Sequence, residues 1–360
     1  MAHPDSPGLY ILNPTARYAW YLLRVGKSFT EAVADFAAQY DISTDIAARD
    51  LGLTWREWEQ SLLAPAPTPG PLPSPPTPPA DSSLDAFSRT YRLHGKDIRV
   101  VLHNPDLIAE IAPRLEPLLA PASSHPRLTL QATAWGNGYH IFSGSTYLAT
   151  EDHPAAARVL FLQELVRNTQ PNRDWAAILH AGACGTDRDC VIFPAASHSG
   201  KTTLAAALMH AGMTFYGDDS IPLERESLTI PGMPFALMIR EGSWPAVSRR
   251  FPNFSNAPVH VRYGENVRFL HPTRAAHHTS ARAAAIVFSR WAPHATTAIS
   301  SLDSFEVLVR LNDSSFWVAH DRDSIQAFLD WIQSLPSYEM LYSDLDEAVA
   351  FIAKLVRWDV

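Results

Sequence analysis

The chain has 360 residues, with 29 Lys and Arg against 37 Asp and Glu and a formal net charge of −8. Two cysteines cannot staple so long a chain, which excludes a disulfide scaffold, and no run of about 18 apolar residues exists for a membrane span. Because the net charge disfavours broad binding of a nucleic-acid backbone and the first residues lack a secretory signal pattern, we expect a cytoplasmic protein with no nucleic-acid or membrane partner.

Residues 1–64 form the first predicted domain. A short strand is expected at 9–12, and Asn13 followed by Pro14 is a favourable helix start. Helical spacing of apolar residues then predicts a helix at 14–23, a second from Ser28 or Thr30, a third from Thr44 and a short fourth from Thr54. One strand followed by three or four short helices is typical of a winged-helix-like domain.

Two interpretations of this first domain compete on composition alone. A DNA-binding helix-turn-helix needs a cationic recognition helix. Residues 44–60 contain only Arg49 and Arg56 as cations and four acidic side chains. This balance disfavours DNA binding and leaves a small packing module as the simpler interpretation.

The first domain also resembles the PqqD family over about residues 9–63. Residues 12–16 match the start of that family's first helix, Thr30 matches its second, and residues 40–42 match its turn. Proteins of that family recognise the leader part of ribosomally made precursor peptides by adding the peptide as a strand. The resemblance therefore implies the leader region of a precursor peptide as a partner.

A proline-rich segment at residues 65–82 separates the two predicted domains. Nine prolines fall between Pro65 and Pro79, and such a run cannot form a helix or a sheet ladder. We expect an extended polyproline-II spacer. The alternative is a docking motif for an aromatic-lined module, but folded domains on both sides favour the spacer.

Residues 83–360 have the composition of an α/β domain. Strands are expected at 91–94, 98–102, 128–131, 139–142, 178–184, 190–194 and 214–216. Helices are expected at 106–119, 155–168 and 204–210.

The stretch 178–219 contains a strand, a loop, a helix, a second strand and an acidic pair, which is the order found around a phosphate-binding loop. Backbone N–H groups of such a loop and of the helix N-terminus cradle phosphates, while a lysine supplies charge. A hydroxyl and an aspartate complete the Mg²⁺ shell. The predicted nucleotide-binding residues are Ser197, His198, Ser199, Gly200, Lys201, Thr202 and Thr203, and the predicted metal ligands are Thr202, Asp218 and Asp219.

The general loop pattern fails at its first position, which is Ala195. The alternative interpretation is a glycine-turned junction between a strand and a helix, with an exposed lysine.

The same stretch resembles the HPr kinase/phosphorylase family, and more closely its HPr-kinase-related serine kinase branch. Ala195 is ordinary in that branch, whereas His198 stands where the family has glycine. The resemblance covers about residues 86–357 and implies a P-loop kinase core of the HPr kinase and PEP carboxykinase type, with a mixed sheet, ATP and Mg²⁺. It is carried by residues 179–183, 194–197, 199–204, Gly212, Asp218 and Asp219.

A kinase of this type needs a base near the acceptor hydroxyl and charges around the transferred phosphoryl group. Neighbouring Asp218 and Asp219 are expected to point to opposite sides of an extended chain, and the resemblance implies that at least one is a base. It also places His180 beside the phosphates, although a buried core histidine is the alternative. Arg240 and Arg290 are candidates for anion contacts.

The resulting hypothesis is an ATP- and Mg²⁺-dependent kinase that phosphorylates a Ser or Thr hydroxyl of a ribosomally made precursor peptide. The first domain would bind that peptide. One alternative is a nucleotide-binding but non-catalytic scaffold that presents the peptide to other peptide-modifying enzymes. Another is a small-molecule kinase whose first domain is only structural.

Overall fold

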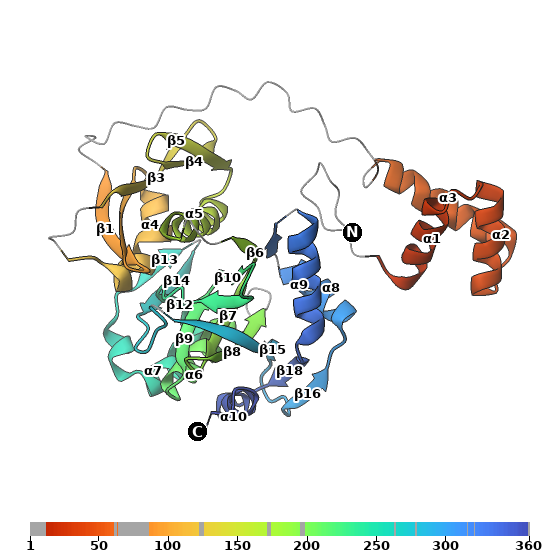
Figure 1. Ribbon diagram of the computed structural model, residues 1–360. Coiled ribbons are helices and arrows are strands. Elements are labelled where there is room, and N and C mark those ends of the chain that lie inside the picture. The colour runs from red at the N-terminus through yellow and green to blue at the C-terminus, as the bar shows by residue number, and fades with distance from the viewer. Residues whose placement is uncertain are drawn as a thin grey trace. The chain divides into compact units, whose positions relative to one another are not determined.

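The computed structural model divides into two compact units, Met1–Pro73 and Ser74–Val360, each with its own hydrophobic core (Figure 1). Most of the strand predicted at 9–12, and the whole of the proline spacer, lie outside the described residues. Those residues are 12–60, 63, 86–121, 126–170, 174–194, 199–262, 264–277, 279–314, 316–319 and 321–358.

The described part of the first unit is made of three helices: α1 (Pro14–Arg24), α2 (Phe29–Tyr40) and α3 (Thr44–Gln60). The side chain of Asn13 accepts a 2.8 Å hydrogen bond from the backbone N–H of Ala16 and so caps α1. Ser28 and Glu31 form a capping box at the start of α2. All three helices contribute buried apolar side chains to one core, among them Leu22, Phe36, Leu51 and Trp58.

Helix α3 corrects one sequence-based prediction. Two separate helices were expected here, the second beginning at Thr54, but α3 is continuous. Ala47, Leu51 and Trp58 are buried on one stripe of the helix. Burial of that continuous face outweighs the cost of about 1 kcal/mol for Gly52 inside a helix.

The second unit begins with a five-stranded sheet covered by two helices. The strands lie in the order β1-β2-β3-β4-β5, and only the pair β2 and β3 is parallel. Side chains of α4 and α5 share one core with the sheet. The elements are β1 (Phe87–Leu93), β2 (Lys96–Leu102), α4 (Pro105–Leu115), β3 (Leu128–Trp135), β4 (Gly138–Ser143), β5 (Thr146–Glu151) and α5 (Pro154–Thr169).

A seven-stranded mixed sheet forms the centre of the second unit. Its order is β16-β18-β15-β8-β7-β9, with β11 paired to β15. Strand β15 is parallel to β8 and β18, and the other pairs are antiparallel. The strands are β7 (Ala181–Gly185), β8 (Asp189–Pro194), β9 (Thr214–Asp218), β11 (Thr229–Pro231), β15 (Ser280–Trp291), β16 (Ala298–Ser301) and β18 (Ser337–Tyr342).

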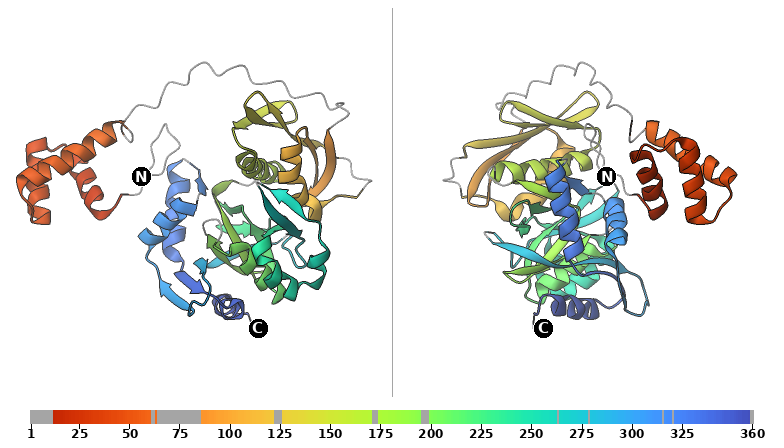
Figure 2. Two further views of the ribbon diagram at one scale, coloured as in Figure 1. Left: turned by 180° about the vertical axis from the view of Figure 1, so that it is seen from behind. Right: turned by 45° about the vertical axis from the view of Figure 1, so that its right-hand side comes forward.

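Helices cover both faces of this sheet (Figure 2). Side chains of α6 and α10 pack in the core on one face, and those of α8 and α9 pack on the other. The sheet is therefore the middle layer of three. The helices are α6 (Lys201–His210), α8 (Ser304–Ser314), α9 (Arg322–Ser334) and α10 (Leu345–Leu355).

Two three-stranded sheets complete the unit, in the orders β10-β6-β17 and β12-β14-β13. Within the described ranges, no helix is both long enough and apolar enough to cross a membrane. The remaining elements are β6 (Trp175–Leu179), β10 (Ile221–Glu224), β12 (Leu237–Arg240), α7 (Trp244–Arg250), β13 (His260–Arg262), β14 (Glu265–Leu270) and β17 (Phe316–Val318).

The strand predicted at 178–184 is split in two. Residue His180 bends the chain, so that β6 and β7 belong to different sheets. Every residue of both strands is buried, and apolar residues on both sides of a single histidine carry no alternation that would mark the bend. The split leaves His180 at the start of β7, where the candidate site lies.

The orientation of α3 generates a stability prediction with an internal control. Leu51 is 1 % exposed and Leu53 is 55 % exposed on the same helix. We expect Leu51→Ala to destabilise the first unit by about 2–5 kcal/mol, because it leaves a cavity in the core. Leu53→Ala is expected to change stability by less than about 0.5 kcal/mol. Urea unfolding followed by circular dichroism tests this, and equal losses would contradict the assigned helix face.

Candidate active site

Three strands of the seven-stranded sheet meet at one edge, and this edge carries the candidate site. Strand β8 ends at Pro194 and β9 ends at Asp218, while the antiparallel β7 between them begins at Ala181, opposite Pro194. His180 directly precedes β7, and α6 begins at Lys201 after the loop that follows β8. The topology therefore brings together residues that lie far apart in the sequence.

Only the second half of the predicted phosphate loop is described. Residues 195–198, which include the predicted contacts Ser197 and His198, lie outside the described residues. Ser199 and Gly200 are described, and Gly200 is the N-cap of α6 with a φ of 91°. That left-handed conformation is one that glycine adopts at low cost.

Packing around Gly200 gives a second reason for a glycine there. A Cβ at this position would lie 3.0 Å from the hydroxyl oxygen of Tyr342 and 3.1 Å from Cβ of Trp291. The backbone N–H of Trp291 also donates a 3.0 Å hydrogen bond to the carbonyl of Ser199. The ends of β15 and β18 thus support the turn into α6, whose first N–H groups can face an anion.

Lys201 is held over the strand ends by three partners. Its Nζ lies 3.2 Å from Nε2 of His180, 3.8 Å from Oδ1 of Asp218 and 3.9 Å from Oδ1 of Asp219. His180 Nδ1 lies 3.0 Å from the carbonyl oxygen of Asp219, so Nδ1 is the donor and Nε2 accepts from the lysine. Burial, followed by the charge of Lys201, lowers the pKa of His180 and keeps the ring neutral.

Thr202 and Asp218 form an oxygen pair at the start of α6. The Thr202 hydroxyl donates a 2.8 Å hydrogen bond to Oδ2 of Asp218. The other oxygen of this carboxylate, Oδ1, is buried and accepts no hydrogen bond from the residues that the structure describes. Burial raises the pKa of Asp218, and the neighbouring charge of Asp219 adds to this.

Asp219 lies in a different environment from its neighbour. Its Oδ2 lies 2.7 Å from Nη1 of Arg114 and 2.8 Å from Nη1 of Arg158. Burial opposes the charged form, but the two guanidinium groups outweigh it and hold the pKa of Asp219 well below its ordinary value. Asp219 also has a φ of 82°, which is strained for a residue with a Cβ.

The other predicted residues have these positions. The hydroxyl of Thr203 donates a 2.8 Å hydrogen bond to Ser243. Arg240 Nε lies 3.3 Å from a carboxylate oxygen of Glu265, and Arg290 is exposed near the end of β15. These contacts give no support for an anion-binding role of either arginine.

Arg114 and Arg158, which contact Asp219, were not singled out from the sequence. Both lie on the core-facing side of their helices and are less than a tenth exposed. Burial lowers the pKa of Arg114 to about 10, so the side chain remains charged at neutral pH. A charged residue on the apolar stripe of an amphipathic helix was the available signal.

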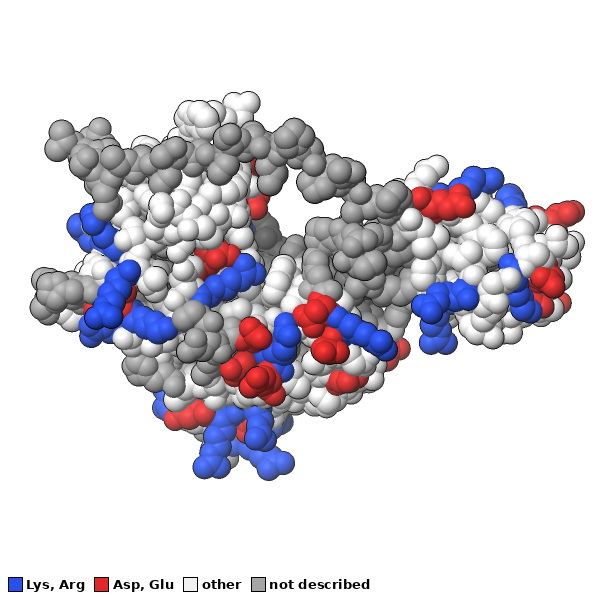
Figure 3. Space-filling view, turned by 45° about the horizontal axis from the view of Figure 1, so that its top comes forward, with Lys and Arg blue, Asp and Glu red and all other residues white. Residues whose placement is uncertain are grey.

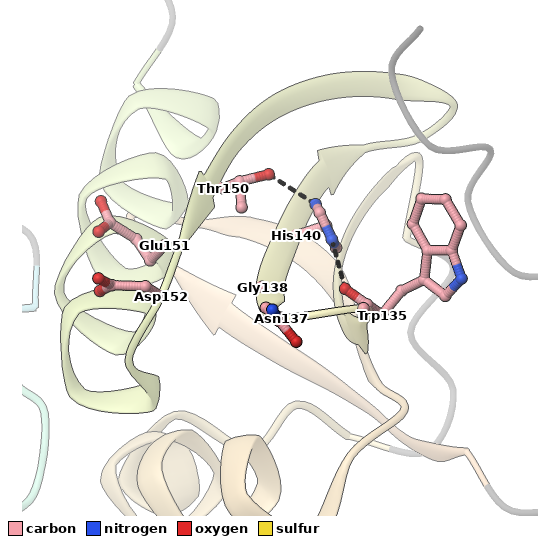
Figure 4. Close-up of a pocket in the computed structure, with 8 residues that line it drawn as sticks. Trp135, Asn137, Gly138, His140, Thr150, Glu151 and Asp152 are labelled. Atoms are coloured by element: carbon pink, nitrogen blue, oxygen red, sulfur yellow. Dashed lines mark hydrogen bonds between the residues drawn. The ribbon is translucent and has the colours of Figure 1, made fainter. Parts of the chain in front are cut away.

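A cavity of about 640 Å³ lies elsewhere in the second unit, at the turn between β3 and β4. It is lined by residues 135–138, His140 and residues 150–152. The ring nitrogens of His140 lie 2.6 Å from the Thr150 hydroxyl and 3.1 Å from the carbonyl of Trp135. Figure 4 shows Glu151 and Asp152 pointing away from His140. Its polar groups do not converge, so the strand edge remains the better candidate site.

The charged side chains on one face of the molecule are mixed in sign. Figure 3 shows Lys and Arg interspersed with Asp and Glu among the described residues of that face. The described residues on that face form no extended basic stripe of the kind that binds a nucleic-acid backbone.

Comparisons with known proteins cover the two units unequally. Residues 1–55 match the family model described as Coenzyme PQQ synthesis protein D (PqqD). No curated protein matches the chain. Among solved structures, the Hpr(Ser) kinase/phosphatase from Coxiella burnetii matches at 11 % identity over 50 % of this chain and 93 % of that one, with a TM-score of 0.24. At that TM-score the likeness defines no fold for the second unit, and the comparisons show only that residues 1–55 are similar to PqqD.

Proposed function

We propose that the second unit binds ATP with Mg²⁺ at the edge of the seven-stranded sheet and transfers the γ-phosphoryl group to a Ser or Thr hydroxyl. One observation carries this proposal. Lys201, Thr202 and Asp218 are in mutual contact at the N-terminus of α6, beside a glycine turn. A helix N-terminus, a lysine, a hydroxyl and a carboxylate at the end of a neighbouring strand together suit a magnesium nucleotide.

The oxygen pair of Thr202 and Asp218 fits Mg²⁺ in its chemistry. Oδ2 of Asp218 lies 2.8 Å from the Thr202 hydroxyl, so these two oxygens can face one ion, while Oδ1, which accepts no hydrogen bond from the described residues, remains for a proton. In the part of the chain that the structure describes, no group of three or more His, Cys, Asp and Glu could hold a metal ion. Mg²⁺ at nucleotide sites takes one or two protein ligands and completes its shell with water and phosphate. When bound, Mg²⁺ would neutralise charge on the phosphates.

The chain's own residues then have separate roles. Lys201 exchanges its carboxylate contacts for phosphate oxygens when the nucleotide binds. His180 holds the lysine through Nε2. Asp218, whose pKa is raised by burial, accepts the proton of the acceptor hydroxyl at Oδ1. Asp219, which is bonded to two arginines, is assigned no proton transfer.

The similarity of residues 1–55 to PqqD supports a peptide as the acceptor. The proposed substrate is a ribosomally made precursor peptide, whose leader region binds the first unit and whose Ser or Thr hydroxyl enters the kinase site. Binding two parts of one peptide on one chain raises the effective concentration of the acceptor at the site. No further peptide-modifying enzyme is required for this step.

Substitution of Lys201 tests the proposed reaction directly. The full chain is incubated with ATP, Mg²⁺ and the peptide encoded beside its gene, and the peptide is examined by mass spectrometry. We expect a mass gain of one phosphate. Lys201→Ala should lower the rate of phosphorylation by about 100-fold or more, because it removes the positive charge beside the transferred phosphoryl group. The exposed Lys354→Ala is the matched control and should leave the rate unchanged.

No mass gain, or one that survives Lys201→Ala in full, would rule out this proposal. Tight binding of ATP without transfer to the peptide would instead favour a nucleotide-binding scaffold.

Thr202→Val should change the requirement for Mg²⁺. The substitution keeps the shape of the side chain and removes the hydroxyl that lies beside Asp218. We expect the Mg²⁺ concentration needed for half-maximal activity to rise by roughly tenfold or more. ATP binding in the absence of Mg²⁺, measured by calorimetry, is the internal control and should stay within about twofold, since the loss lies in the metal's ligand set. An unchanged Mg²⁺ requirement would exclude Thr202 as a ligand.

Removal of residues 1–80 separates peptide recognition from phosphoryl transfer. The shortened chain retains almost all of the compact unit Ser74–Val360. It should bind ATP with unchanged affinity, while KM for the precursor peptide rises by roughly tenfold or more because the leader contact is lost. An unchanged KM for the peptide would show that the first unit does not recognise it.

A further inference from the structure

Two buried arginines from α4 and α5, the helices that cover the five-stranded sheet, reach the end of β9. Arg114 lies at the end of α4 and Arg158 in the first half of α5, and their side chains are only 3 % and 7 % exposed. Both contact the same oxygen, Oδ2 of Asp219. Burying these charges is costly unless they are closely paired, so the contact is a defined part of the fold.

A second carboxylate, that of Glu110, contacts one of these two arginines. Glu110 lies 3.2 Å from Nε of Arg158 and 2.5 Å from Nε of Arg262. Glu110 is buried. Among the described residues, its arginine partners are Arg158 and Arg262, whereas those of Asp219 are Arg114 and Arg158. The arrangement thus offers two kinds of carboxylate, one directed at the strand edge and one that only supports an arginine.

The pairing determines where Asp219 points. With its backbone in the left-handed region, Asp219 directs its carboxylate towards the arginines and its carbonyl towards Nδ1 of His180. His180 in turn accepts a hydrogen bond from Lys201. A continuous chain of contacts therefore runs from α4 and α5 to the lysine of the candidate phosphate site.

We propose that Arg114 and Arg158 are positioning residues of the phosphate site. By pairing with Oδ2 of Asp219, they limit its carboxylate to a 3.9 Å contact of Oδ1 with Lys201, and they hold the carbonyl that fixes His180. Helices α4 and α5, which cover the five-stranded sheet, thus contribute side chains that position the phosphate site. This inference rests on the proposed function, because it concerns the same nucleotide site.

Two variants test the proposal through nucleotide affinity. Arg158→Met keeps an unbranched apolar stem and removes one partner of Asp219. We expect its Kd for ATP with Mg²⁺, measured by calorimetry on the full chain, to rise about tenfold or more, since the partly freed carboxylate competes for Lys201 and repels phosphate. Adding Asp219→Asn to Arg158→Met should restore most of the affinity, because the competing charge is removed.

Glu110→Gln is the matched control. It disturbs the same buried ion-pair network and should lower the melting temperature, as Arg158→Met does. Its Kd for ATP should nevertheless stay within about twofold, because both arginine contacts of Asp219 remain. If the two variants weaken ATP binding equally, or if Asp219→Asn fails to rescue Arg158→Met, the arginines are structural only and the inference is overturned.

A separate comparison covers the case in which Arg158→Met does not fold. Asp218→Asn and Asp219→Asn both conserve volume, and the proposal assigns proton transfer only to Asp218. We expect kcat to fall about 100-fold or more for Asp218→Asn and less than about tenfold for Asp219→Asn. Equal losses would overturn the assignment of Asp219 to positioning. If the wild-type chain binds no ATP, the proposed function itself fails, and this inference fails with it.

Discussion

A buried carboxylate between two guanidinium groups is the contact on which the candidate site depends. Desolvation of Asp219, Arg114 and Arg158 is unfavourable by itself, and only their short contacts compensate for it. Asp219 directly follows β9, and the two arginines lie on α4 and α5. The three groups can therefore pair only when these helices are packed against the end of the seven-stranded sheet. The strained φ of Asp219 is tolerated for the same reason.

The adjacent residues Asp218 and Asp219 show how surroundings separate identical side chains. Both are buried, yet the pKa of one is raised and that of the other is held well below its ordinary value. Among the described residues, Asp218 contacts a hydroxyl and a more distant lysine, and the desolvation of its charge prevails. Asp219 has two arginines in contact, so the charged form prevails. Their division of roles follows from their neighbours.

The part of this site that could be predicted from the sequence is the local part. Lys201, Thr202 and the acidic pair belong to consecutive elements, and the strand, loop, helix and strand around them have clear apolar patterns. Arg114 and Arg158 lie on helices far upstream in the sequence. Their contact with Asp219 depends on how α4 and α5 pack against the end of the seven-stranded sheet. The bend at His180 was missed for a related reason, because buried strands on both sides of it read as one apolar run.

The chain of contacts from α4 and α5 also changes how the second unit should be divided. The five-stranded sheet shares its core mainly with its own two helices, although Trp175, Met233 and Phe235 from the rest of the unit also join it. The two helices also place cations at the end of β9, where apolar side chains would leave the Asp219 carboxylate with only its 3.9 Å contact to Lys201 among the described residues. A carboxylate in that state would either turn towards Lys201 or become protonated, and each outcome alters the charge around the proposed phosphate site. The helices of the five-stranded sheet, although outside the proposed P-loop core, therefore help to set the charge around the proposed phosphate site.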